Sequence, residues 1–418
     1  MKLLINLCGH DGIISHYAGV GTIVRRYIEV IQEILKEKNI EYHLNLFTLE
    51  FNRDSMGYNK EIWDYHKSLE NTSIYILSNG TYGETSFGNI NNWILASKNV
   101  AEVINNIDFN EYDYVINLCN DTPFALLVTM IKNNKNSFKV WIPHSTGKIY
   151  NEDMSLSDEM QTTDKRVEME QEVIDYINNN DNSYVISTGE YIKNHLINEY
   201  GLKHNIDIIN GELLYRNNEY EENNRMKEIL DEINKYDSII MSLGRAESYK
   251  NLDKTMLLGE KLGIKPVVIT QQYFENQPIV FEYKKLAQKT NALLYVDEPF
   301  ALPQYIVKYY NKPMILLIPS EREIFGLVIN EMRRFNKSNV LIVANDRGGL
   351  HEQIDDCNNG LLVDLNYIEK SADKIKKYFN INTIKKFNKK GQETLSERYD
   401  LKKNFNEFFK LIMGDEYE

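Results

Sequence analysis

The strongest constraint on the fold is an alternation along the 418 residues of short apolar segments with longer segments of helical period. This alternation is typical of βαβ units, whose strands lie parallel in one sheet. The first half predicts strands at 3–7, 42–47, 73–77, 114–118, 138–142 and 184–187, and helices at 21–38, 90–106, 123–134, 165–178 and 190–200. The second half predicts strands at 238–243, 266–270, 292–296, 314–318, 340–343 and 360–363.

A charged, Asn-rich stretch at 217–237 separates the two series of strands and carries a helix-like segment. A chain of this length exceeds one ordinary core, so we expect two α/β domains, residues 1–213 and 214–390. Residues 391–418 are expected to form a terminal helix that packs back toward the N-terminal domain. Its apolar face is formed by Leu401, Phe405, Phe408, Phe409 and Ile412.

Charge and composition exclude several classes of partner. The formal net charge is −13, and no run of five or more Lys or Arg residues occurs, which argues against nucleic acid and disfavours contact with anionic lipid. No stretch of 18 apolar residues is present, so we expect no transmembrane segment. The three cysteines form neither a disulfide framework nor a zinc pattern, and a cytoplasmic protein with reduced thiols is expected.

The segment 319–331 carries the densest group of candidate functional residues. It follows the strand expected at 314–318, and a helix is expected to begin near Phe325. The N–H groups at the start of such a helix attract a diphosphate. Gly326 would let a ligand approach the backbone closely.

Two glutamates in this segment, Glu323 and Glu331, can accept hydrogen bonds from sugar and ribose hydroxyls. The alternative is that Glu323 is solvated and that Glu331 pairs with a neighbouring basic residue. The sequence alone leaves both interpretations open.

A second segment, 242–253, also follows a strand and starts a helix. Gly244 allows the turn, and Arg245 and Lys250 can converge on one anion. Two fixed cations would neutralise a departing diphosphate without a metal. The alternative is a strand-end turn with two solvated cations.

Two further glycine turns, at 346–352 and 16–22, each lie between an expected strand and an expected helix. Either turn alone is a weak signal, because such loops are common in α/β proteins.

Taken together and in this order, the four strand–loop–helix units resemble the retaining glycosyltransferases of family four, the large group-one class. That family has a glycine loop near the N-terminus, a GR…K…D motif, an E-x7-E motif after Pro-Ser, and a GG…E turn. The matching residues here are Gly19, Gly21, Gly244, Arg245, Lys250, Asp253, Glu323, Glu331, Gly348, Gly349 and Glu352. The family's linker turn appears as Asn-Gly at 210–211. The resemblance implies a GT-B fold, with two Rossmann-like domains whose parallel sheets face across a cleft.

The resemblance also implies roles for individual residues. Arg245 and Lys250 would hold the diphosphate, Glu323 would face the donor sugar, and Glu331 would contact the ribose. The remaining donor contacts would come from Gly19, Gly21, Gly244, Ile324, Phe325, Gly326 and Leu327. His144, which ends the strand at 138–142, matches a histidine that often contacts the sugar. A capping or core histidine is the alternative.

Two departures from the family pattern bear on the subfamily to which the chain would be assigned more than on the expected activity. Met332 follows the second glutamate where a small residue is usual, and the turn at 309–313 differs from the usual one. Neither departure touches a proposed ligand contact.

The reaction implied is transfer of a sugar from a nucleotide diphosphate sugar, with UDP expected from family frequency, to an unidentified acceptor with retention of configuration. No Asp-x-Asp motif and no cluster with metal-ligand spacing occurs in the sequence, so neither metal nor cofactor is expected. Two alternatives stay open. They are an inactive GT-B binding or stabilising subunit and a GT-B sugar-nucleotide epimerase, in place of the transferase.

Overall fold

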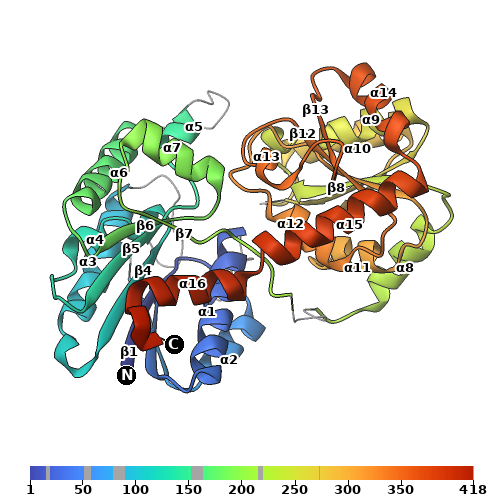
Figure 1. Ribbon diagram of the computed structural model, residues 1–418. Coiled ribbons are helices and arrows are strands. Elements are labelled where there is room, and N and C mark those ends of the chain that lie inside the picture. The colour runs from blue at the N-terminus through green and yellow to red at the C-terminus, as the bar shows by residue number, and fades with distance from the viewer. Residues whose placement is uncertain are drawn as a thin grey trace. The chain divides into compact units, whose positions relative to one another are not determined.

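The structure, a computed structural model, describes residues 1–15, 19–50, 58–78, 90–151, 163–214, 220–272 and 274–417. The chain divides into two compact units. The first unit contains Met1–Asn210 and Leu401–Glu418, and the second contains Gly211–Asp400. Each unit is built on a parallel sheet with helices on its faces, as Figure 1 shows. The expected fold class, two Rossmann-like α/β domains, is confirmed.

The sheet of the first unit has seven strands in the order β3-β2-β1-β4-β5-β6-β7. Its strands are β1 (Lys2–Cys8), β2 (Glu41–Leu49), β3 (Thr72–Leu77), β4 (Tyr114–Asn120), β5 (Ser137–Ile142), β6 (Ser183–Ser187) and β7 (Asn205–Asp207). Its helices are α1 (Gly19–Glu37), α2 (Lys60–Lys67), α3 (Ile90–Asn105), α4 (Leu127–Met130), α5 (Gly147–Asn151), α6 (Thr163–Asn178), α7 (Glu190–Tyr200) and α16 (Leu401–Met413). The central strands are buried on both faces, which explains their continuous apolar runs.

The sheet of the second unit has six strands in the order β10-β9-β8-β11-β12-β13. Its strands are β8 (Ile239–Arg245), β9 (Lys265–Gln271), β10 (Leu293–Val296), β11 (Met314–Ile318), β12 (Val340–Asn345) and β13 (Leu361–Val363). Its helices are α8 (Asn224–Ile233), α9 (Leu252–Leu262), α10 (Pro278–Thr290), α11 (Leu302–Tyr309), α12 (Leu327–Phe335), α13 (Leu350–Gln353), α14 (Ile368–Tyr378) and α15 (Ile381–Arg398). Apolar clusters of this unit include one with residues of α8, α11 and α12, one with residues of α9, α14 and α15, and a smaller one with residues of α9 and α10.

One expected helix is wrong. The sequence predicts a helix at 123–134, whereas the chain forms a 3-10 turn at Thr122–Phe124 and the short α4. Asp121 enters the turn with φ of 64°. The Ile131 carbonyl, just after α4, accepts a hydrogen bond from the buried ammonium group of Lys139 at 2.6 Å. A tertiary hydrogen bond therefore occupies the Ile131 carbonyl at the position where the expected helix would have continued.

A row of buried asparagines crosses the centre of the first sheet. Asn6 of β1 lies opposite Asn45 of β2 and Asn117 of β4. The Asn45 amide donates to Asn6 at 2.9 Å, and the Asn6 amide donates to Asn117 at 2.8 Å. Polar partners at matching positions fix the register of three strands whose apolar residues alone would tolerate a shift.

Helix α16 belongs to the first unit, although 190 residues of the second unit precede it. The Phe405 ring contacts the Tyr27 ring edge-on at 4.8 Å, and the Lys402 ammonium lies 2.6 Å from the carboxylates of Glu33 and Glu37 on α1. The terminal segment was expected to start at residue 391, but α15 continues to Arg398 and stays with the second unit.

Candidate functional site

Three of the four predicted motifs lie at one edge of the second sheet. They follow β8, β11 and β12, which are neighbours in the sheet. Because carboxyl ends of adjacent parallel strands meet at the same edge, residues distant in sequence are brought together there. The backbone N–H of Glu321, after β11, donates to the Tyr249 carbonyl, after β8, at 2.8 Å.

The structure brings Lys250 and Glu323 into direct contact. The Lys250 ammonium donates to Glu323 Oε1 at 2.6 Å, and the side chains are 17% and 21% exposed. A short 3-10 turn, Ser248–Lys250, directs the lysine, and Asn251 follows it with φ of 51°. Glu323 is thus paired and half-buried, unlike the solvated carboxylate of the alternative interpretation.

Arg245 is the last residue of β8 and precedes the same turn. Its guanidinium donates to the Tyr249 hydroxyl at 3.0 Å and pairs with Glu247 at 3.2 Å. The Lys250 ammonium lies 5.3 Å from the centre of the Tyr249 ring, and the Arg322 guanidinium lies 6.0 Å from it. Three cations therefore surround one tyrosine. Tyr249 and Arg322 were not predicted from the sequence, since neither residue is part of the motifs.

The GG turn at 348–349 supports the loop that carries Glu323. The N–H of Gly349 donates to the Glu323 carbonyl at 2.7 Å. A Cβ added to Gly349 would lie 1.9 Å from the Ile324 carbonyl oxygen, and one added to Gly348 would lie 2.4 Å from that of Glu323. The two loops pack backbone against backbone, and only glycines allow this approach.

Gly326 precedes α12 with φ of 80°, in the left-handed region. The helix begins at Leu327, two residues later than expected. Among the described residues, no side chain caps its N-terminus. The Gln353 amide donates to the carbonyls of Phe325 and Gly326, the latter at 2.9 Å, and so fixes the entry of the chain. The predicted backbone residues Ile324–Leu327 lie in this entry segment.

Glu331 lies on α12 and is partly exposed. Arg334, on the same helix, pairs with the buried Glu212 carboxylate at 3.1 Å. Arg333 is buried and donates to the Gln353 carbonyl at 2.9 Å, and desolvation lowers its pKa to about 10. These contacts give both arginines a structural role within the second unit.

In the first unit, Gly19 and Gly21 start α1, whereas residues 16–18 of the same motif lie outside the described residues. A Cβ added to Gly21 would lie 2.4 Å from Asp11 Oδ2. The Asp11 carboxylate accepts the Gly12 N–H at 2.9 Å and the Ser15 hydroxyl at 2.6 Å. Gly21 therefore makes room for a carboxylate of its own unit, which the sequence did not single out.

His144 follows β5 and is partly buried. Its Nε2 lies 3.4 Å from Asn120 Oδ1. The pKa of His144 is lowered to about 4, mainly by desolvation; the Asp121 carboxylate raises it and His10 lowers it, each by less. The imidazole is therefore neutral at pH 7 and can exchange hydrogen bonds with a hydroxyl group. His10 Nε2 lies 3.9 Å from the Asp121 carboxylate, at the carboxyl ends of β1 and β4.

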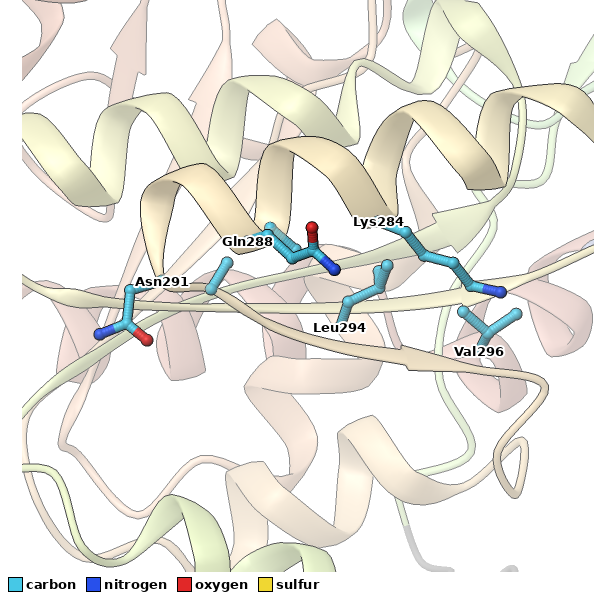
Figure 2. Close-up of a pocket in the computed structure, with 7 residues that line it drawn as sticks. Lys284, Gln288, Asn291, Leu294 and Val296 are labelled. Carbon is cyan, nitrogen blue, oxygen red and sulfur yellow. The ribbon is translucent and has the colours of Figure 1, made fainter.

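A separate shallow pocket of about 390 Å³ lies beside the edge strand β10. Figure 2 shows Lys284 and Gln288 of α10 above Leu294 and Val296 of β10. None of the predicted site residues lines this pocket.

The described residues contain neither a candidate metal site nor a membrane-spanning helix. No group of three His, Cys, Asp or Glu side chains there could hold a metal ion. No helix in the described ranges is long and apolar enough to cross a membrane.

Comparisons with known proteins agree with this geometry. Residues 225–398 match the family described as Glycosyl transferases group 1. No curated protein matches the chain.

Solved structures resemble the chain over 99% of its length. Sucrose-phosphate synthase from Thermosynechococcus elongatus has a TM-score of 0.72 at 14% identity, with 99% of that chain covered. A glycosyltransferase from Rickettsia africae has a TM-score of 0.64 at 16% identity and 99% coverage. HepE from Anabaena, in complex with UDP and glucose, has a TM-score of 0.65 at 14% identity and 100% coverage. The chain therefore has the GT-B fold, and its residues 225–398 are similar to the family of group 1 glycosyl transferases.

Proposed function

We propose that the protein is a cytoplasmic hexosyltransferase that moves a sugar from a UDP-sugar to an acceptor hydroxyl, without a metal and with retention of configuration. The observation that carries this proposal is the 2.6 Å contact between Lys250 and Glu323. It joins the GR…K and E-x7-E motifs at one sheet edge, where the GG turn also packs. UDP is the nucleotide in the HepE complex, a protein of the same fold.

The cations of this edge suit a departing diphosphate. Arg245 and Lys250 flank Tyr249, and Arg322 lies over the same ring. The N-terminus of α12, which no described side chain caps, adds backbone N–H groups and a positive dipole end. Charges fixed before the reaction stabilise a developing anion at little reorganisation cost.

In the proposed reaction the bond between the anomeric carbon and the phosphate oxygen breaks. The acceptor oxygen bonds to the same face of that carbon, and its proton passes to the departing phosphate. The enzyme supplies position and electrostatics. Glu323 would accept hydrogen bonds from sugar hydroxyls, Glu331 would contact the ribose, and the neutral His144 would contact the sugar.

A thermal-shift panel of UDP, GDP, ADP, dTDP and their sugar conjugates tests the donor assignment. Ligand at about 100 times its dissociation constant adds about 2.7 kcal/mol of stability. We expect UDP or its sugar conjugates to stabilise the wild type, Glu331→Ala to lose most of that shift, and Glu282→Ala to retain it. Glu282 is an exposed glutamate of α10 and serves as the control.

The same panel separates the proposal from its alternatives. A folded wild type that no nucleotide stabilises would favour a binding subunit. If a UDP-sugar binds, NMR of the products distinguishes sugar transfer with retention from epimerisation. A glycoside with the donor's anomeric configuration supports the proposal, whereas an epimerised sugar nucleotide with no glycoside formed supports an epimerase.

A further inference from the structure

The segment after β5, residues 144–148, is held at four consecutive positions; it consists of the loop at 144–146 and the first two residues of α5, and is called the 144–148 loop below. The Ser145 hydroxyl accepts a hydrogen bond from Arg166 at 3.0 Å. The Thr146 hydroxyl lies 2.8 Å from His195 Nε2, and the Lys148 N–H donates to the Tyr200 hydroxyl at 3.3 Å. Gly147, between them, is bound by Glu170, as described next. These partners come from α6 and α7, the helices that flank β6 in sequence.

The Glu170 carboxylate is the centre of this network and is 0% exposed. It accepts the Gly147 N–H at 2.9 and 3.1 Å, the Arg166 Nε–H at 2.7 Å, and the Tyr200 hydroxyl at 2.6 Å. A buried carboxylate is tolerated only when its oxygens are paired and hydrogen-bonded. Here the pairing is complete, and it fixes a backbone amide three residues after His144.

Arg166 extends the network to the end of β4. Its Nη2 donates to the Thr122 hydroxyl at 2.8 Å as well as to Ser145. Its guanidinium lies 5.8 Å from the centre of the Trp93 ring. Because Glu170 neutralises Arg166 at 2.7 Å, the pair carries no net charge toward an acceptor. Its geometry suits a brace for the loop better than an anion site.

We propose that Glu170 and Arg166 are positioning residues that hold the 144–148 loop, and with it the His144 imidazole, in the arrangement needed for sugar transfer. This inference rests on the proposed function, since it assigns a purpose to the fixed position of His144. A site group displaced by about 1 Å can lose about 100-fold in rate, so a rigid brace has a catalytic value.

The first measurement is hydrogen–deuterium exchange of the full chain, without nucleotide, in the wild type and Glu170→Gln. The glutamine keeps the size but loses the charge-assisted bonds to Gly147 and Arg166. We expect exchange across 144–149 to rise about tenfold or more, because charge-assisted bonds contribute about twice as much as neutral ones. Unchanged exchange in this segment would overturn the proposal, whatever the activity.

The second measurement is steady-state kinetics. We expect kcat of Glu170→Gln to fall about 10- to 100-fold, as for other residues that orient a functional group, with KM for the UDP-sugar changed less than about threefold. Glu170→Asp should restore part of kcat. A normal kcat, or a loss confined to KM, would contradict a positioning role.

A matched control lies on β5, at Lys139, whose side chain contacts the helix that carries Glu170. The buried Lys139 ammonium donates to Tyr176 of α6, and to the Ile131 carbonyl and Asn133, each at 2.6 Å. Lys139→Met removes a buried polar centre of the same unit without touching the 144–148 loop. It should lower stability but leave kcat and exchange across 144–149 as in the wild type. If Lys139→Met lost as much kcat as Glu170→Gln, the Glu170 effect would be explained by general destabilisation of the unit, and the positioning role would be contradicted.

Two further measurements separate a failure of the loop proposal from a failure to fold and from a failure of the proposed function. Should Glu170→Gln fail to fold, Thr146→Val removes one anchor with a side chain of nearly the same shape, and the same rise in exchange is expected. A folded wild type that turns over no sugar nucleotide defeats the proposed function. The exchange experiment does not depend on that result and tests the loop by itself.

Discussion

At the scale of single residues, the Glu323 loop shows how glycines position a charged side chain. Gly348 and Gly349 bring one backbone against another, and Gly326 turns the chain into α12. Glu323 then meets Lys250, which is 73 positions away in sequence. The glycines act through what they lack, a Cβ, rather than through a bond to a ligand.

Gly349→Ala should therefore disturb donor binding without placing any group in the site. The added methyl would lie 1.9 Å from the Ile324 carbonyl oxygen, so the Glu323 loop must move. We expect UDP to bind about tenfold more weakly, about 1.4 kcal/mol, in a thermal-shift titration. Gly263→Ala is the control: nothing lies within 4 Å of its new methyl, and the local strain at its φ of 69° lies at the C-terminus of α9. Equal UDP affinity in both variants would contradict this explanation.

Sequence patterns located these residues but not their neighbours. Arg245, Lys250 and Glu323 were predictable because motif spacing and strand-end position coincide. Tyr249, Asp11 and Glu170 were not, because each also depends on a contact that only the tertiary fold supplies, which for Tyr249 is the one with Arg322. Asp11 lies against Gly21, and Glu170 binds an amide 23 positions away. No short-range pattern encodes such pairs.

At the scale of elements, strands were easier to predict than helices. Buried parallel strands are continuous apolar runs, and each expected strand is present. The edge strand β7, only three residues with polar ends, gave no such signal. The helix expected at 123–134 failed because tertiary contacts outweighed local propensity. The asparagine row across β2, β1 and β4 is likewise invisible before strand order is known.

Asn6 is the centre of that row, and we expect its loss to be the most costly. Asn6→Leu leaves the Asn45 amide and the Asn117 carbonyl oxygen without their partner, at about 3 kcal/mol of unfolding free energy. Asn45→Leu breaks one of these bonds and should cost less. The tryptophans, Trp63, Trp93 and Trp141, all belong to the first unit, so fluorescence during urea unfolding reports on it. A larger loss of unfolding free energy for Asn45→Leu than for Asn6→Leu would contradict the central place of Asn6 in the asparagine row.

At the scale of the whole molecule, the first unit is discontinuous in sequence. Residues 1–210 form its sheet, and residues 401–418 return to it after the second unit. Phe405, Phe408 and Phe409 of α16 are buried, which accounts for the aromatic helical face recognised in the sequence. The fold class was predictable from the alternation of strand and helix periods. The positions where the chain passes from one unit to the other, 210–211 and 400–401, depend on tertiary packing and were not predictable in the same way.

Phe405→Ala should loosen the first unit selectively. The Phe405 side chain is 0% exposed and contacts Tyr27, so its truncation is expected to cost about 3–5 kcal/mol. Hydrogen exchange should rise in α1 while β8, β11 and β12 stay protected. Leu411→Ala, on the same helix but 62% exposed, is the control and should change neither. Loss of protection spread equally over both sheets would refute this selectivity.

The return of α16 also determines the order in which the molecule can be completed during translation. A ribosome releases residues 211–400 before residues 401–418, so the second unit has all of its sequence while the first still lacks a helix. Domains usually mature from the N-terminus onward. Here the N-terminal sheet emerges first, but the first unit is completed last, when α16 has been synthesised. Before that, the surface of the first unit that α16 covers is available to chaperones.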